Sequence, residues 1–227
     1  MDRASLRIHT PALAATATAI AIIPGTLPAQ EFIWDTTPDA AVVGGSGVLD
    51  ENGAPNFQSP TGVPNQTFPG NAALAFIALG PGANNVTVEG TVAVTGLRFE
   101  VSGYNLWQGP SGRLVSATPG VNLTLSNGAE VEISVEMDGS FAVAGNGTLT
   151  LAGTQSDLLD LQVNGGATLD AFATNANALT NFGTVVNSGS FGILNNQGNF
   201  TNTVGGVIRG NATNSGGTMA LAGTFGA

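Results

Sequence analysis

The stretch EVEISVEMD, residues 130–138, is where acidic side chains gather most densely in this sequence. Every second position in it is polar, in the order Glu130, Glu132, Ser134, Glu136 and Asp138. In an extended strand alternate residues share one face, with same-face neighbours about 6.6 Å apart. Such a row of carboxylates can bind Ca²⁺, or can hydrolyse a glycan when two of them flank the bond that is cut. The simpler interpretation is a solvated face that keeps the strand soluble and blocks pairing with other chains.

Asp157 and Asp160, in the segment SDLLD, form a second candidate acid pair. On a strand this odd spacing would place the two carboxylates on opposite faces, where they could not act together. Only a loop would bring both of them to one site. The candidate ligand-binding residues are therefore those of the first row: Glu130, Glu132, Glu136 and Asp138.

The composition excludes most other kinds of catalytic site. The chain has no cysteine and no lysine, and its single histidine, His9, lies in the leader described below. Catalysis by Ser-His-Asp or Cys-His groups, Schiff bases on lysine, and zinc sites made of Cys or His are therefore excluded beyond the leader. The formal net charge is -10, and the only cations beyond the leader are Arg98, Arg113 and Arg209, so we expect no nucleic acid partner. We predict no catalytic residue, no metal, no cofactor and no enzymatic activity.

The first 29 residues have the pattern of an export signal. Arg3 and Arg7 supply a positive start, and PALAATATAIAII, residues 11–23, supplies an apolar core. A small-residue cleavage site follows in PGTLPAQ, with cleavage expected after Ala29. The alternative is a permanent transmembrane anchor, but this apolar run is shorter than the roughly 20 residues that a spanning helix needs. We predict a signal peptide over residues 1–29 and an exported protein.

Beyond the leader the pattern of residue types changes at about residue 75. Residues 30–75 have a Pro, Gly or Asn every few positions, which predicts an irregular N-terminal cap with short strands. From residue 76 onward, runs such as VTVEGTVAVTGLRF alternate apolar residues with others at the period of a half-buried strand. SDLLDLQV could begin a helix at Ser156, but the Asn-Gly that follows it favours a strand.

A loose repeat of Asn-x-Gly, then a small or polar residue and an apolar one, begins at Asn181, Asn187, Asn196 and Asn214. Self-similarity of this kind indicates stacked repeats. We predict an all-β fold, a right-handed parallel β-helix (β-solenoid) over residues 76–227, whose coils are joined by backbone hydrogen bonds and by stacked asparagines. Coils of about 20 residues would give about seven coils and a rod of roughly 35 Å. An antiparallel sandwich or barrel and substantial disorder are the alternatives.

The segment from Asn84 to Met137 resembles the autotransporter-associated β-strand repeat. That pattern has Val-Thr-Val pairs, a V-x-x-L-x-F strand and a G-Y-x-L turn before a Leu-Thr-Leu strand. The matching positions here are Val94, Leu97, Phe99, Gly103, Tyr104 and Leu106. The Trp34-Asp35 pair after the leader is similar to the Trp-rich start of such proteins, and the Asn-x-Gly tail is similar to their stems.

The resemblance implies the passenger of a Gram-negative autotransporter or a related large adhesin, displayed outside the cell and acting in adhesion or self-association. Its partners would be glycans or proteins on a host or neighbouring cell, or other copies of the chain. A membrane would be involved only through a C-terminal β-barrel, whose alternating strands and aromatic girdles this sequence lacks, so we expect a passenger fragment. The alternative is a polysaccharide-active β-helix enzyme, a hydrolase or lyase, which would need two or three carboxylates from successive coils converging in a groove.

Overall fold

The computed structural model describes residues 30–37, 41–59, 61–64, 66–153, 155, 157–172 and 175–226. Within these ranges every regular element is a β-strand, as the sequence predicts. The same ranges therefore hold no helix of the length and apolar character that crossing a membrane requires. The predicted signal peptide, residues 1–29, lies outside the described residues.

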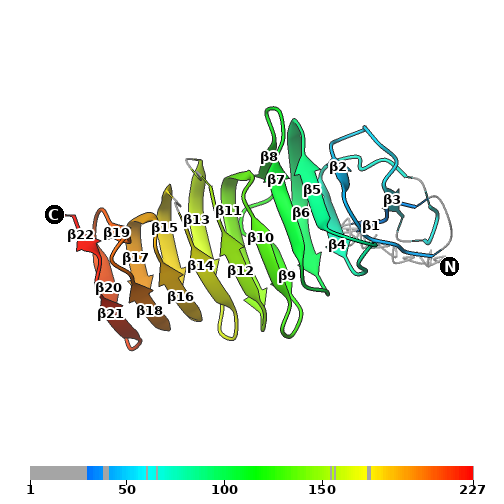
Figure 1. Cartoon of the computed structure of the whole chain (residues 1–227). Coiled ribbons are helices and arrows are strands. Elements are labelled where there is room, and N and C mark those ends of the chain that lie inside the picture. The colour runs from blue at the N-terminus through cyan, green and yellow to red at the C-terminus, as the bar shows by residue number, and fades with distance from the viewer. Residues whose placement is uncertain are drawn as a thin grey trace, which may run out of the picture.

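The strands form two sheets that extend along an elongated molecule (Figure 1). The 13-stranded sheet consists of β1 (Glu31–Trp34), β3 (Phe57–Gln58), β4 (Ala72–Phe76), β6 (Thr91–Phe99), β8 (Arg113–Ser116), β9 (Val121–Leu125), β11 (Glu136–Gly145), β13 (Leu158–Val163), β15 (Asn175–Asn181), β17 (Ser190–Asn196), β19 (Val207–Ile208), β20 (Ala212–Asn214) and β22 (Thr224–Phe225). The 9-stranded sheet consists of β2 (Gly47–Leu49), β5 (Asn84–Val88), β7 (Tyr104–Gln108), β10 (Glu130–Ile133), β12 (Thr148–Leu151), β14 (Thr168–Ala171), β16 (Thr184–Asn187), β18 (Asn199–Asn202) and β21 (Thr218–Leu221).

The chain winds as a coil, because it visits the two sheets in turn. After β10 it passes to β11 in the other sheet, then returns to β12, which pairs in parallel with β10, and to β13, which pairs in parallel with β11. This arrangement is a parallel β-solenoid of about seven turns. The prediction of a parallel β-helix is confirmed, and the strand SDLLDLQV was expected to form is β13. Antiparallel pairing joins β1 and β3 near the N-terminal end, but it does not build the two sheets.

In-register pairing places side chains from successive strands of a sheet above one another, and each such set is called a column here. Five successive members of one inward column, each from a different coil, are buried: Val131, Leu149, Leu169, Val185 and Phe200. Close approach of neighbouring coils requires small residues at some turns. Gly145 has φ +93°, and a Cβ there would lie 1.9 Å from the Leu125 carbonyl oxygen. A sequence rich in glycine can therefore build a continuous core, because each coil contributes only a few apolar side chains.

Aromatic side chains fill the N-terminal end of the core. Trp34 and Phe57 pack edge to face with ring centroids 5.3 Å apart, and Phe57 lies 5.5 Å from Phe68. All three are fully buried, and the Trp34 indole N–H donates a hydrogen bond of 3.0 Å to the Gly45 carbonyl. Because β3 pairs beside β1 at the end of the strand order, it covers a sheet edge that would otherwise be open.

The aromatic packing continues into the first coils. Phe76 and Phe99 stack with ring centroids 4.6 Å apart and planes only 4° from parallel. Tyr104 is buried beside them, where its hydroxyl donates to the Ala78 carbonyl at 2.7 Å and accepts from the Gly45 N–H at 3.2 Å. Burial raises the pKa of Tyr104 to about 12, so the phenol stays protonated over the whole ordinary pH range.

Toward the C-terminus the inward columns change from aliphatic residues to asparagine. In the 13-stranded sheet Val143 and Val163 are followed in the same column by Asn181, Asn196 and Asn214. The Asn181 amide donates to Asn196 Oδ1 at 2.7 Å, and the Asn196 amide donates to Asn214 Oδ1 at 2.9 Å. The predicted stacking of asparagines from coil to coil is therefore confirmed.

A second ladder lies in the 9-stranded sheet. The Asn187 amide donates to Asn202 Oδ1 at 2.8 Å, and both side chains are fully buried. The same two side chains also hold the following turns, because Asn187 Oδ1 accepts from the Gly189 N–H and the Asn202 amide donates to the Gly206 carbonyl. Each asparagine thus stabilises its own turn and its contact with the next coil.

Candidate ligand-binding surface

The predicted row of carboxylates does not lie on one strand. Glu130 and Glu132 belong to β10 of the 9-stranded sheet, the chain turns at Ser134, and Glu136 and Asp138 belong to β11 of the 13-stranded sheet. The expectation of one continuous acidic face was therefore wrong. The expectation failed because inward and outward residues continue to alternate through the turn at Ser134, so the sequence shows no break between the two strands.

The alternation itself was predicted correctly. The apolar residues between the acidic ones are all buried: Val131, Ile133, Val135 and Met137. A side chain from the next coil holds the corner, because Gln155 is fully buried and takes the place of a strand neighbour. Its amide donates to the Val135 carbonyl at 3.0 Å, and its Oε1 accepts from the Met137 N–H at 2.8 Å.

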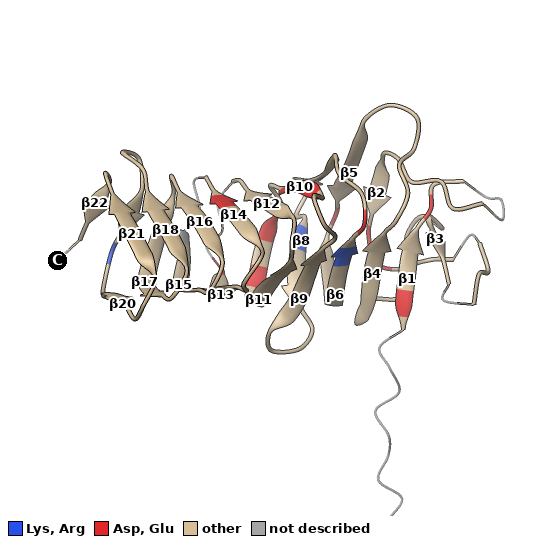
Figure 2. Ribbon diagram, turned by 90° about the horizontal axis from the view of Figure 1, so that it is seen from below, with Lys and Arg blue, Asp and Glu red and all other residues tan. Residues whose placement is uncertain are grey.

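Glu136 and Asp138 form ion pairs with Arg113 on β8 of the preceding coil. Figure 2 shows the blue segment of β8 beside the red segments of β11. The guanidinium nitrogens lie 3.3 Å from a carboxylate oxygen of each, and 2.9 Å from an oxygen of Asp157. One cation thus links three successive coils, its own and the two that supply the carboxylates. This half of the predicted row serves to join coils, and its oxygens are less available to a ligand.

A similar pairing lies nearer the N-terminus. Arg98 on β6 reaches across β4 to Glu31 on β1, with nitrogen–oxygen distances of 2.9 and 2.7 Å, and it also pairs with Glu100. Ala75 is the register neighbour of Arg98 on the strand between, and its small side chain leaves room for the arginine to pass. The hydrogen bonds that Arg98 donates to Glu31 raise the pKa of Arg98.

Glu130 and Glu132 are the half of the row that faces a ligand-accessible hollow. Neither forms an ion pair with any residue that the structure describes. They border a shallow pocket of about 310 Å³ on the outward side of the 9-stranded sheet, which is lined by Ser102, Gly103, Asn105, Glu130, Val131, Glu132 and Thr150. The Ser102 hydroxyl accepts from the Glu130 N–H at 3.1 Å and so fixes the backbone at the rim. These two glutamates are the part of the predicted site that can contact a ligand.

A third carboxylate lies along the same outward column. Glu132 is in register with Thr150, and Thr150 is in register with Asp170, so the two acids are two strand spacings apart, about 9.6 Å between Cα atoms. Burial raises the pKa of Asp170. Thr150 stands between them, and no three acidic, His or Cys side chains among the described residues are grouped closely enough to hold a metal ion.

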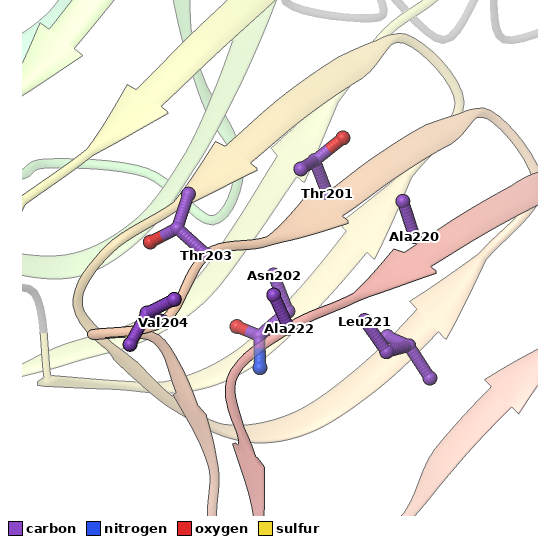
Figure 3. A pocket seen from close by; sticks show the side chains of 7 residues that line it. All are labelled: Thr201, Asn202, Thr203, Val204, Ala220, Leu221 and Ala222. Atoms are coloured by element: carbon purple, nitrogen blue, oxygen red, sulfur yellow. The ribbon is translucent and has the colours of Figure 1, made fainter.

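A further hollow lies between β18 and β21 (Figure 3). Its volume is about 490 Å³, and it is lined by Thr201, Asn202, Thr203, Val204, Ala220, Leu221 and Ala222. None of these residues is titratable, and the Asn202 amide is already bonded within its ladder and turn. The hollow can offer apolar contact, but it has no group for acid–base chemistry.

Sequence reasoning did not identify three features of this region. Arg113 was noted only as one of few cations, Gln155 was not singled out, and Asp170 was not connected with Glu132. The signals were weak, because each depends on which coil lies beside which, and coils here differ in length.

Comparison with known proteins found a relative that is an autotransporter adhesin. No family model matches the sequence, and no solved structure matches it. Over 150 residues the chain is 32% identical to a protein named Adhesin BmaC autotransporter, from Brucella suis biovar 1 (strain 1330). The aligned region covers 64% of this chain but only 4% of the relative. The expected resemblance is confirmed: the chain is a β-solenoid similar to a small part of an autotransporter adhesin.

Proposed function

We propose that this chain is part of an exported, cell-surface β-solenoid, like the passenger of an autotransporter, which acts in adhesion or self-association. The observation that carries the proposal is its similarity to an autotransporter adhesin, in a chain whose strands wind into a parallel solenoid. The protein acts outside a Gram-negative cell. Its partners are glycans or proteins on a host or neighbouring cell, or further copies of the chain.

The outward side of the 9-stranded sheet supports this role. From β12 to β21 one outward column is polar, uncharged and in register: Thr148, Thr168, Thr184, Asn199 and Thr218. Its members recur about every 4.8 Å along the rod. A hydroxyl or amide can both donate and accept a hydrogen bond, so each coil offers one weak contact. Contacts that are weak singly become strong together when many of them engage at once.

A polysaccharide-cleaving enzyme is the second candidate, and one observation favours it. The spacing of Glu132 and Asp170 approaches the roughly 6.5–9.5 Å that separates the carboxyl groups of inverting glycosidases, and the raised pKa of Asp170 suits a general acid. However, Asp170 does not line the pocket that Glu132 borders, and Thr150 separates the two. Adhesion therefore remains the better-supported function.

The test is to couple the purified protein to fluorescent beads and to measure their attachment to epithelial and bacterial cells, and their clustering with each other. We expect attachment or clustering that rises steeply with the density of protein on the beads, because many weak contacts act together. In parallel, release of reducing ends from soluble polysaccharides is measured. Polysaccharide breakdown by beads that neither attach nor cluster would replace adhesion by the enzyme hypothesis.

Two matched variants locate the adhesive face. Thr184→Arg places a long cation in the outward column of the 9-stranded sheet, whereas Thr213→Arg adds the same side chain to the exposed strand β20 near the C-terminal end of the other sheet. We expect the first variant to reduce attachment or clustering and the second to leave it unchanged. The opposite result would place the C-terminal contacts on the 13-stranded sheet.

A further inference from the structure

A separate pocket lies on the outward side of the 13-stranded sheet, and no residue of the predicted acidic row lines it. Its volume is about 280 Å³, near the lower end of the roughly 300–1,000 Å³ typical of small-molecule sites. It is lined by Gly120, Ser140, Phe141, Ala142, Asp160, Leu161, Gln162, Ala178 and Thr180. Three neighbouring strands, β11, β13 and β15, supply most of this lining.

The hollow results from the sizes of side chains that stand in register. Asp160 is flanked in its outward column by Ser140 on one side and Ala178 on the other. Gln162, in the adjacent outward column, is flanked by Ala142 and Thr180. The long polar side chains of Asp160 and Gln162 therefore lie between neighbouring strands whose outward side chains are short. Ala142 and Ala178 form the apolar floor of the pocket beside these polar groups.

A break in the strand pairing positions the acid. The register between β11 and β13 shifts between Gly139 and Ser140, where Gly139 pairs with Leu158 and Ser140 pairs with Asp160. The extra residue, Leu159, is left exposed. Such bulges re-aim the side chains next to them and are over-represented beside functional sites. Here the bulge brings Asp160 to the outward side, level with Ser140.

The polar groups of the pocket supply both acceptors and donors, because the Asp160 carboxylate accepts, whereas the hydroxyls and the Gln162 amide donate and accept. The Ser140 hydroxyl donates to Asp160 Oδ2 at 3.4 Å, and the Gln162 amide donates to Asn164 Oδ1 at 2.6 Å. Asp160 forms no ion pair with a described residue, and no arginine lines the pocket. A carboxylate without a nearby cation disfavours anionic ligands, so phosphate groups and acidic sugars are excluded.

We infer that the pocket around Asp160 and Gln162 binds a neutral sugar unit of a surface glycan. Vicinal hydroxyls of a sugar donate to the carboxylate and exchange hydrogen bonds with the amide and with the hydroxyls of Ser140 and Thr180. The C–H side of the ring packs on Ala142. The inference rests on the proposed adhesive function, since it names the ligand class of one contact on the rod. One such shallow pocket holds a monosaccharide at millimolar Kd, and repeated engagement on a cell raises the strength of binding.

The test is a titration of the full-length, ¹⁵N-labelled protein with methyl glycosides of glucose, galactose, mannose and N-acetylglucosamine, followed by NMR. Concentrations from about 0.1 to 10 mM bracket the expected Kd. We expect at least one glycoside to shift the amide signals of Ser140, Asp160 and Gln162 in a saturable way. Asp160→Asn and Gln162→Ala should each weaken that binding by about tenfold, because each removes a hydrogen-bonding partner from a hydroxyl of the sugar. Ala142→Leu, which fills the floor and keeps every polar group, should abolish it.

Two controls remove similar groups elsewhere. Glu89→Gln neutralises one carboxylate outside the pocket, and Gln197→Ala truncates an exposed glutamine in another turn; both should bind like the unmodified protein. Circular dichroism confirms that each variant is folded. Absence of saturable shifts with all four glycosides, or equal effects of pocket and control variants, would each overturn the inference. If beads that carry the Asp160→Asn variant attach to cells as well as beads with the unmodified protein, adhesion does not depend on this pocket and the proposed function is unaffected. If the protein binds a glycoside but its beads do not attach to cells, the sugar site stands and the proposed adhesive function is wrong.

Discussion

The central coils and the C-terminal coils hold their neighbours in different ways. In the coils before β15, aromatic and aliphatic side chains fill the core, and Arg98 and Arg113 pair with carboxylates of neighbouring coils. From β15 onward, asparagine ladders enter the core and Arg209 is the only charged residue in the sequence (Figure 2). Ladder partners are only 15 residues apart from Asn181 to Asn196, whereas Val143 and Val163 are 20 apart.

In the C-terminal coils a shorter spacing between register partners therefore coincides with asparagine in part of the core. Phe191 and Phe200 are still buried there, but the backbone groups at the tight turns need hydrogen-bond partners. Asparagine meets this need, because its amide is small and can donate and accept at once. A longer coil has room for a conventional hydrophobic core, and it can keep charged groups outside. Each side of this comparison can be tested by its own substitutions.

The largest effect is expected from removing an aromatic ring of the central core. Phe99→Ala deletes a fully buried side chain stacked on Phe76, and it should lower the free energy of unfolding by about 3–5 kcal/mol. Phe182→Ala is the matched change in the C-terminal part, where the ring is 41% exposed, and it should cost less than about 1 kcal/mol. Urea titration followed by circular dichroism measures both. Equal losses would mean that the ring stack adds nothing to the central core.

The ladder is expected to be the next most sensitive feature. Asn196→Ala removes the amide that bonds Asn181, Asn214 and the Gly198 and Thr218 carbonyls. The partners left unsatisfied should lower the free energy of unfolding by about 2–3 kcal/mol. In the control, Asn199→Ala truncates an exposed asparagine on the next strand. A loss no larger than that of the control would show that the ladder is a consequence of tight coiling and does not stabilise it.

Tyr104 provides a pH-dependent test of the central core, and it is the only tyrosine in the sequence. An unfolded tyrosine has a pKa of 10.0, whereas burial holds that of Tyr104 at about 12. Between these values the unfolded chain has lost the proton and the folded chain has kept it, so the free energy of unfolding falls as the pH rises from 10 to 12. Ultraviolet absorbance of the tyrosinate should therefore rise near pH 12. A transition centred near pH 10 in the folded protein would contradict the buried, doubly hydrogen-bonded phenol.

The smallest effect is expected from the ion pairs. Arg98→Met should lower the free energy of unfolding by less than about 1 kcal/mol, because its side chain is one-third exposed and solvent screens the pair with Glu31. The loss should shrink in high salt. Arg209→Met is the C-terminal counterpart, since Arg209 bonds the Ala176 carbonyl at 3.4 Å and pairs with no carboxylate among the described residues. Its effect should not depend on salt; thermal melts at low and high salt distinguish the two.

Repetition made the ladder predictable, and irregularity hid most of the site. Asn181 and Asn196 each begin an Asn-x-Gly repeat, and the recurrence of this motif predicted that they would stack on one another. Asn202 belongs to a ladder as well, but it is followed by Thr-Val and lacks the motif. The corner at Ser134 was missed because alternation continues through it. The ion pair of Arg98 with Glu31 joins residues 67 apart, and no sequence pattern records which coil lies beside which.

The same reasoning explains why the pocket at Asp160 was not foreseen. The sequence places Asp157 and Asp160 three positions apart, and strand alternation suggested opposite faces. In the structure Asp157 precedes β13 and pairs with Arg113, while a one-residue bulge at Leu159 sets the direction of Asp160. A bulge is defined by two strands together, so it leaves no mark in either strand alone.

The in-register columns also determine how the rod responds to mechanical load. Each coil is bonded to its two neighbours along the axis, so tension applied to the ends detaches coils one after another from the more weakly held end. Unwinding the 15 residues from Asn187 to Asn202 frees about 50 Å of extended chain, whereas the folded coil contributed only about 5 Å of length. Each coil that unwinds therefore becomes roughly tenfold longer, so the rod can lengthen stepwise under a sudden pull.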